Sequence, residues 1–279
     1  MKTLTYPQID NIDLWDKIVS HKHQPTKNQL LRIRDKVVAR YNYYSEHYDT
    51  LDEILPLPSE EWSGVKDALI SCYGDNVEFK RVRQQQFSSL SATDKTKCPY
   101  CLLSRPSTLD HYFDKNDYPE FSVFIPNLVP CCSECNNIKS TTTFDVNNNR
   151  VFLHFYHDHI PEEQFLFVRF SGTNPDAVPV ISIGLRFGEE NYYSSLLQRH
   201  FTKLSLISKY RNAILDRIAP ILEEIRMYKE IGTSSENIKA SLQIKHSSLA
   251  NHYGHNYWET CIYEGILNSP GFLEQILSA

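Results

Sequence analysis

The 279-residue chain lacks any long apolar run. Its first residues, MKTLTYPQIDNIDLWDKI, interrupt every short apolar stretch with Asp or Asn, so the apolar stretch of a signal peptide is missing. Nothing later approaches the roughly 20 consecutive apolar residues that a membrane-spanning helix requires. We therefore expect a cytoplasmic protein that has no membrane partner.

The chain also lacks an excess of positive charge, since 29 Lys and Arg stand against 34 Asp and Glu, a formal net charge of −5. Strong non-specific binding of nucleic acid requires a broad basic surface. The composition therefore excludes a protein that coats nucleic acid by bulk attraction, and any nucleic-acid site must be local. We find no internal repeat and no low-complexity linker, while 41% hydrophobic residues can supply a core.

Four of the seven cysteines fall into two pairs, Cys98-x-x-Cys101 and Cys132-x-x-Cys135. In a reducing compartment this spacing favours a metal site over disulfides, because each pair supplies two thiolates from one tight turn. Two such turns complete the tetrahedron that Zn²⁺ prefers, with no open position. The sequence therefore predicts a structural zinc site. Cys131 could compete with Cys132, but the spacing to Cys135 favours Cys132.

Hydrophobic periodicity predicts an α+β fold with three regions. Residues 1–90 are predicted to be helical, with apolar residues at helical spacing from Leu30 to Tyr44 and a helix from Ser59, as its N-cap, to Gly74. Residues 91–150 contain the cysteine pairs. Residues 151–279 begin with three short β-rich runs, RVFLHFYHD, EQFLFVRFS and VPVISIGLRF.

The β-rich runs predict a small antiparallel sheet, with a turn at GTNPDA between the last two. Helices return from Glu189, with an interruption expected at Pro220, because proline lacks an N–H, and two more helices near 234–252 and 255–267. The C-terminal segment NYWETCIYEGILNSPGFLEQIL could be a docking helix. Its residues Trp258, Ile262, Ile266 and Leu267 would also serve as core.

Thirty residues separate Cys101 from Cys132, and they include LDHYFDK and FIPNLVP, which lead into CCSECNNIKS. From Cys98 to about Ser140 this order resembles the HNH endonucleases of the ββα-metal superfamily. The resemblance implies a zinc-stapled ββα-metal core inside a mainly helical chain, as an HNN variant. By position, His111, Asn127 and Asn136 match the three residues of the family's name, and Asp110 precedes the first of them.

The resemblance also implies roles for these residues in hydrolysing a phosphodiester. His111 would be the general base, since imidazole is mostly neutral yet basic at physiological pH. Asp110 and Asn136 offer hard oxygen ligands to a catalytic Mg²⁺ or Mn²⁺. Asn127 would orient the His111 ring through its other nitrogen, and Lys139 would reach a phosphate.

The interpretation of Asp110-His111 as a catalytic pair depends on two conditions. Consecutive residues of a regular strand point to opposite faces, so the strand must bend at its end for both to face one site. Without the cysteine pairs, an ordinary polar pair would be the better interpretation.

A second histidine group at His154, His157 and His159 could be mistaken for a metal site, but no cysteine pair supports it.

Local charge favours a nucleic-acid substrate. From Lys80 to Lys115 the chain has seven basic residues, among them Arg105 and Lys115, against three acidic residues. Arg105 and Lys115 are therefore candidate nucleic-acid contacts, in addition to Lys139 from the resemblance, with DNA favoured and RNA possible. The flanking regions resemble anti-phage effectors of the Septu and retron-associated kinds, which implies a regulatory ATPase partner. A nuclease that cuts tRNA and a non-catalytic zinc-stapled binding module remain alternatives.

Overall fold

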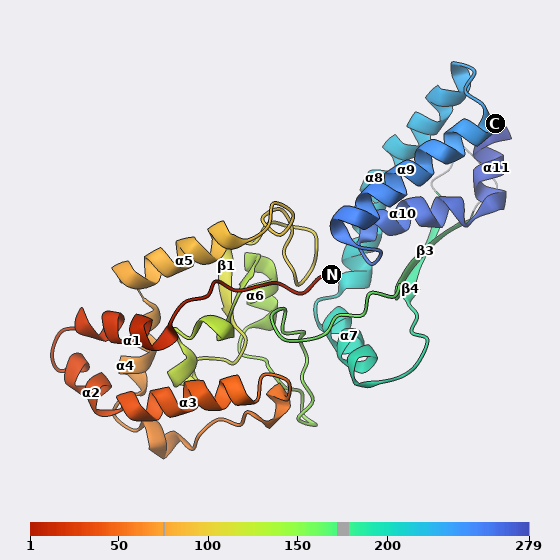
Figure 1. The fold of residues 1–279 in the computed structure, drawn as a ribbon. Coiled ribbons are helices and arrows are strands. Elements are labelled where there is room, and N and C mark those ends of the chain that lie inside the picture. The colour runs from red at the N-terminus through yellow and green to blue at the C-terminus, as the bar shows by residue number, and fades with distance from the viewer. Residues whose placement is uncertain (75, 172–178, 279) are drawn as a thin grey trace. The chain divides into compact units, whose positions relative to one another are not determined.

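The computed structural model describes residues 1–74, 76–171 and 179–278, and the chain divides into two compact units. We call Thr3–His159 the N-terminal unit, and Met1–Lys2 with Ile160–Ala279 the C-terminal unit. Both are mixed: helices dominate, and each unit holds one two-stranded antiparallel sheet (Figure 1). None of the helices in the described ranges is long and apolar enough to cross a membrane.

The N-terminal unit begins with helices and ends around a short hairpin. Its α-helices are α1 (Asn11–Ser20), α2 (Thr26–Arg32), α3 (Arg34–Glu46), α4 (Lys66–Ile70), α5 (Val77–Ser89) and α6 (Ser133–Lys139). Its strands are β1 (Thr108–His111) and β2 (Leu128–Cys131). Short 3-10 turns occupy Leu51–Glu53, Ser59–Trp62, Ser71–Tyr73, Pro119–Phe121 and Ile125–Asn127.

The C-terminal unit consists of one hairpin and five helices among its described residues. The strands are β3 (Leu166–Ser171) and β4 (Val180–Leu185). The helices are α7 (Tyr192–Lys203), α8 (Leu206–Glu230), α9 (Ser235–Tyr253), α10 (Trp258–Leu267) and α11 (Pro270–Ser278). The two helices expected near 234–252 and 255–267 are thus confirmed as α9 and α10.

One aromatic core joins the first helices to the cysteine-rich segment. The ring of Tyr41 in α3 stacks on Phe124 with centroids 4.2 Å apart, and Tyr44 meets Phe121 edge-on at 5.3 Å. Each such pair adds about 0.5–1.5 kcal/mol to the apolar burial. Residues 1–90 and 91–150, predicted as separate regions, therefore belong to one compact unit, which ends at His159 and not at 150.

The helical prediction for residues 26–74 is confirmed by α2 and α3, whereas after Ser59 only the short helix α4 and two 3-10 turns form. The pattern from Leu30 to Tyr44 forms two helices, α2 and α3, which meet at Ile33. Ser59 does not cap a long helix, because it starts a four-residue 3-10 turn after Pro58 and its side chain makes no capping bond. Gly74 does end the helical segment, following the turn Ser71–Tyr73.

The hairpin of β1 and β2 positions Asp110 and His111, two of the predicted site residues, at the end of β1. Its antiparallel register pairs Asp110 with Val129 and His111 with Leu128, so His111 is the last residue of β1. After β2 the chain turns at Cys132, the N-cap of α6, and α6 packs against β1. In the sequence, β1 and β2 lie between the two cysteine pairs, and α6 begins at the second pair.

RVFLHFYHD was predicted to be a strand, and this prediction is wrong. The segment forms no strand, although Phe152, Leu153 and Phe155 are fully buried. The carboxylate of Asp158 pairs with the Arg150 guanidinium and accepts the backbone N–H of His154 at 2.6 Å. These bonds fold the segment on itself, so its backbone does not extend along a neighbouring strand.

The C-terminal hairpin is half buried. Leu166, Val168 and Phe170 alternate toward the helices, and β3 packs chiefly against α10. Its strands confirm two of the three predicted runs, whereas the predicted turn at residues 172–177 lies outside the described residues. On α10, Trp258, Ile262 and Ile266 are buried, so the core interpretation of this segment fits and a docking face does not.

The long helical pattern after residue 189 breaks at a different residue from the one predicted. Ser205, which adopts a positive φ of 54°, separates α7 from α8, and Pro220 lies inside α8. The helix continues through Pro220 because Ile214, Ile218 and Ile221 maintain a buried stripe on both sides of it. The exposed proline costs one backbone hydrogen bond without disturbing that stripe.

Gly265 allows α10 to approach β3 closely, and we predict that Gly265→Ala destabilises the C-terminal unit. An added Cβ would lie 2.7 Å from the Val168 carbonyl oxygen and 3.0 Å from the Phe170 ring. The overlap costs about 1–3 kcal/mol, more than the roughly 1 kcal/mol that alanine gains in a helix. Urea unfolding measures the difference.

Gly188→Ala is the matched control, because a Cβ at Gly188 meets no atom within 4 Å. We expect its free energy of unfolding to stay within about 0.5 kcal/mol of the wild type, as for an ordinary surface change. A Gly265→Ala protein that is as stable as the wild type or more stable would contradict the close approach of α10 to β3.

Candidate functional site

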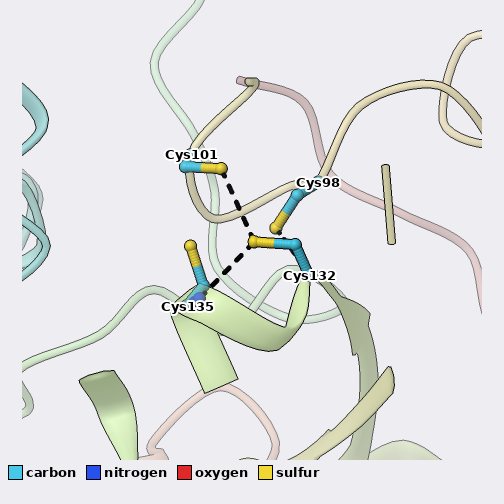
Figure 2. A group of neighbouring side chains, drawn as sticks. All are labelled: Cys98, Cys101, Cys132 and Cys135. Atoms are coloured by element: carbon cyan, nitrogen blue, oxygen red, sulfur yellow. Dashed lines mark hydrogen bonds between the residues drawn. The ribbon is translucent and has the colours of Figure 1, made fainter. Parts of the chain in front are cut away.

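The four predicted zinc-ligand cysteines come together in the N-terminal unit. Their sulfur atoms lie within 4.8 Å of one another, and all four residues are buried. Figure 2 shows Cys98, Cys101, Cys132 and Cys135 pointing toward one another from a loop and from the start of α6. Among the described residues, no other group of three or more His, Cys, Asp or Glu side chains has a spacing that could hold a metal ion.

The cluster's chemistry fits a tetrahedral ion. Four sulfurs at about 2.3 Å from a central Zn²⁺ lie about 3.8 Å from each other, and the Cys101 and Cys132 sulfurs are 3.9 Å apart. Backbone N–H groups of Cys132 and Cys135 donate to the sulfurs of Cys98 and Cys132, at 3.2 and 3.4 Å. This buried group could therefore hold a structural metal such as zinc.

Cys131 lies outside the cluster, as the sequence predicts. It ends β2, and its sulfur is 3.4 Å from the Thr108 hydroxyl of the paired strand. Burial raises the pKa of the Cys131 thiol, and the nearby Asp110 carboxylate raises it further. By contrast, the neighbouring sulfurs of Cys132, Cys135 and Cys98 lower the pKa of Cys101.

A pocket of about 250 Å³ opens beside the end of β1. Its lining includes three residues predicted to be catalytic, namely Asp110, His111 and Asn136, and the predicted nucleic-acid contact Lys115. Asp110 and His111 both line the pocket. The chain bends at Tyr112 and Phe113, directly after the strand, where a bend is expected from the sequence.

The His111 ring is held in one tautomer. Its Nε2 lies 2.9 Å from the carbonyl oxygen of Ser122, and a carbonyl only accepts, so Nε2 carries the proton. Nδ1 is then left with a free lone pair. Burial lowers the pKa of His111 to about 3, and the nearby charges of Lys115 and Lys139 lower it as well, so the ring is neutral at physiological pH.

Asp110 is buried, and polar and charged groups surround it. Its Oδ2 accepts the Tyr100 hydroxyl at 2.7 Å, and its Oδ1 lies 3.2 Å from Lys139 Nζ. Burial raises the pKa of Asp110, and the Lys139 ammonium opposes this shift. Because Tyr100 lies between Cys98 and Cys101, it connects the cysteine cluster directly to the pocket.

Lys139 occupies a different place from the one that its predicted role requires. Its side chain is fully buried, and its ammonium donates to the His111 carbonyl at 2.7 Å as well as pairing with Asp110. A phosphate contact would require this ammonium to face solvent. Lys139 instead fixes the end of α6 against the end of β1.

Asn127 does not touch the imidazole of His111, contrary to the predicted role. Its side-chain oxygen accepts the Phe113 N–H at 2.8 Å, and its amide donates to the Phe113 carbonyl at 3.1 Å. The Ser122 carbonyl orients the ring instead. Asn127 therefore supports the loop that follows His111, and acts on the pocket only through the backbone.

The predicted nucleic-acid contacts Arg105 and Lys115 have different surroundings. Lys115 lines the pocket, and its ammonium lies 5.2 Å from the centroid of the Tyr73 ring. Arg105 is exposed on the loop that follows the first cysteine pair and is not among the pocket's lining residues. Of these two, Lys115 is thus the one placed to meet a phosphate inside the pocket.

Tyr73 and Asp114 are among the lining residues that the sequence does not single out as candidates. The Tyr73 ring packs on the His111 ring with centroids 4.3 Å apart, and its hydroxyl donates to the Leu109 carbonyl. Tyr73 lies far before His111 in the chain, so no local pattern points to it. Asp114 offers a further carboxylate three residues after His111, where LDHYFDK could have suggested it.

In the second histidine group, His154 is part of the core, His157 is half-buried and His159 is exposed. His154 Nδ1 accepts the Tyr156 N–H at 3.3 Å, which leaves Nε2 to donate to the Tyr44 hydroxyl at 3.0 Å. His157 packs against the rings of Tyr6 and Tyr48. The interpretation of this group as a metal site is not supported, since its members are not part of the described metal-compatible group.

Comparisons with known proteins add a distant relative. No family model matches the chain, and no solved structure matches it. Protein ea31 of Escherichia phage lambda is 26% identical over 245 residues, which cover 82% of this chain and 81% of that protein. The similarity thus extends over most of both chains, well beyond the segment with the cysteine pairs, and the relative's name states no activity.

We predict that one structural metal ion per chain is bound by the cysteine cluster. Cys132→Ser should lose the ion and unfold much of the N-terminal unit, because binding of a structural metal is coupled to folding. Cys131→Ser should keep both the metal and the fold, since that thiol lies outside the cluster. Metal analysis and circular dichroism of the two variants make the comparison, and the reverse outcome would move the ligand to Cys131.

We predict that the N-terminal unit becomes less stable in acid, because folding lowers the pKa of His157. Burial lowers the pKa of His157 to about 4, with help from Arg150, whereas the unfolded chain has a histidine pKa of about 6.5. The unfolded state therefore binds the proton first, and the free energy of unfolding decreases as the pH falls below about 6.5. Between pH 7 and 5, His157 alone accounts for about 2 kcal/mol.

Urea unfolding at pH 7, 6 and 5 tests this sign. Between pH 7 and 5, the free energy of unfolding should decrease by about 2 kcal/mol less in His157→Phe than in the wild type. Phenylalanine keeps the aromatic contacts but has no group that titrates. His23→Phe is the matched control, because His23 is exposed in the same unit. Equal pH dependence in wild type and His157→Phe would show that His157 protonates freely in the folded protein.

Proposed function

We propose that the protein is a metal-dependent endonuclease of the HNH type that hydrolyses phosphodiester bonds. The observation that carries the proposal is the pocket that His111, Asp110 and Asn136 line together, with the His111 ring held through Nε2 so that Nδ1 can accept a proton. A neutral base next to hard oxygen ligands is the combination that activates a water against a phosphodiester. The adjacent cysteine cluster accords with the same family resemblance.

In this mechanism His111 acts through Nδ1. Nδ1 takes a proton from a water, the water oxygen attacks phosphorus, and the bond from phosphorus to the leaving oxygen breaks, after which that oxygen takes a proton from solvent. The Ser122 carbonyl holds Nε2–H and so keeps the reactive tautomer in place. Asn127 positions His111 by holding the backbone at Phe113. Tyr73 positions it by packing on the imidazole ring.

We further propose that a divalent cation binds at the oxygen-bearing residues of the pocket. Asp110, Asn136 and Asp114 line it together, and carboxylate and amide oxygens are the ligands that Mg²⁺ or Mn²⁺ prefers. Both oxygens of Asp110 have protein partners, yet a carboxylate offers about four lone-pair sites and can accept further contacts. When bound, the ion would supply charge stabilisation at the phosphate and the leaving oxygen.

We favour DNA as the substrate, with Lys115 as the pocket's contact to a phosphate and RNA as the alternative. The wider role that we propose is an anti-phage effector controlled by a partner ATPase, which rests on the resemblance of the flanking regions. The relative in phage lambda favours a second candidate role, in which such a nuclease serves a phage. Cleavage assays with and without the protein encoded by a neighbouring gene separate the two roles.

The test is cleavage of plasmid DNA and of total RNA in Mg²⁺ or Mn²⁺ by the purified protein. His111→Ala should reduce the rate by about 10²- to 10⁴-fold, because it removes the base while leaving the cysteine cluster intact. His23→Ala is the control, since His23 is exposed and does not line the pocket. Gel electrophoresis measures the rates, and metal analysis verifies the zinc content of each variant.

Two outcomes would count against this proposal. Full activity of His111→Ala would remove His111 from the mechanism. Binding of nucleic acid without hydrolysis in either divalent ion, by a protein whose cysteine cluster is loaded, would favour the zinc-stapled binding module instead. Cleavage restricted to RNA would reassign the substrate and leave the catalytic residues unchanged, because water is the attacking group in both cases.

A further inference from the structure

The hairpin of the C-terminal unit leaves one of its faces open. Leu166, Val168 and Phe170 face the helices, so the alternate residues of β3 face away from them. The register places Gly184 opposite Phe167 and Ser182 opposite Arg169. Small residues of β4 therefore lie beside an aromatic ring and a guanidinium on the open face.

A shallow groove of about 290 Å³ follows this open face. Phe167, Arg169, Ser182 and Arg186 are among its lining residues. A Cβ at Gly184 would meet no atom of the described residues within 4 Å, so that part of the chain leaves space above the strand for a ligand. The groove thus offers room for a planar group along two arginine side chains.

Phe167 and Arg186 form a stacked pair in the groove. The Arg186 guanidinium carbon lies 5.2 Å from the centroid of the Phe167 ring. A guanidinium over an aromatic ring keeps its second face and its N–H groups available. Nucleic-acid bases stack on such planes, and the N–H groups match the geometry of phosphate oxygens.

The charge of the groove differs from that of the whole chain. No acidic side chain lines it in the described part of the chain, although the protein's net charge is −5. Arg169 is exposed, and within the described residues neither Arg169 nor Arg186 forms an ion pair. Glu163 and Glu189 line the adjoining cavity that also includes Arg186, and so limit the basic surface at that end.

We propose that this groove binds a single-stranded segment of nucleic acid, an inference that rests on the proposed nuclease function. A base stacks on the Arg186–Phe167 pair, and phosphates contact Arg169 and Arg186. A duplex cannot bind in this way, because its bases are covered by their neighbours. The C-terminal unit then contributes a substrate contact of its own, in addition to the pocket of the N-terminal unit.

Fluorescence anisotropy with labelled single-stranded DNA and RNA tests the proposal, in a His111→Ala background so that the probes stay intact. Arg169→Glu should weaken binding at least about 10-fold and make its salt dependence shallower, by about 0.7 in the log–log slope for each phosphate that the variant no longer neutralises. Phe167→Ala should weaken binding about 5-fold or more, because a base can no longer stack on the aromatic pair. A duplex probe should bind more weakly than either single strand.

Arg211→Glu is the matched control, because Arg211 is exposed on α8 and the change in net charge is the same. The proposal is overturned if Arg169→Glu binds as tightly as the wild type, or weakens no more than Arg211→Glu. It is also overturned if the duplex probe binds best. Comparison of the DNA and RNA probes then identifies the sugar that the groove accepts.

Hydrolysis of bis(p-nitrophenyl) phosphate separates this proposal from the proposed function. This small diester requires only the pocket, so Arg169→Glu, with His111 intact, should hydrolyse it at the wild-type rate while cutting long nucleic acid more slowly. Absence of all hydrolysis in the wild type would refute the nuclease and leave the binding result as an independent test of the groove.

Discussion

The pocket depends on the buried ion pair between Asp110 and Lys139. Both side chains are almost completely removed from water, and a buried charge without its partner costs about 3–5 kcal/mol. The pair therefore joins the last residue of α6 to the end of β1, since neither charge can remain buried alone. Because Lys139 also holds the His111 carbonyl, this single interaction fixes the backbone from which the proposed base projects.

Support for this arrangement comes from parts of the chain that are far apart in sequence. Tyr100, inside the first cysteine pair, donates to Asp110, so the cysteine cluster and the ion pair are linked through one residue. Tyr73 reaches His111 from the helical segment, and Asn127 holds the backbone after it. The part of the unit that precedes the cysteine pairs thus contributes one lining residue to the pocket, Tyr73.

The sequence predicts this site well where residue spacing alone determines geometry. Paired cysteines separated by two residues must present their sulfurs together, and a strand that ends in Asp110-His111 must place both near the following turn. Contacts across long separations do not follow from spacing. The Ser122 carbonyl that orients His111 has no side-chain signal at all, and Tyr73 resembles any other tyrosine of a helical pattern.

The failures of prediction have a related cause. Lys139 has the sequence context of a phosphate contact, but burial of Asp110 requires a cation, and Lys139 supplies it. RVFLHFYHD has the β-branched and aromatic residues of a strand, but the pairing of Arg150 with Asp158 and the burial of its aromatic rings hold it as a compact loop. In both cases a charge that must be neutralised overrides the local pattern.

The division of the chain into units has a practical consequence for dissecting the protein. The C-terminal unit is not continuous in sequence, because Met1 and Lys2 belong to it while Thr3 belongs to the other unit. The Met1 side chain is buried there, and Lys2 Nζ donates to the His252 carbonyl at 3.0 Å. A fragment that starts at Ile160 therefore exposes the surface that Met1 covers, so a single cut between the units does not release two intact halves.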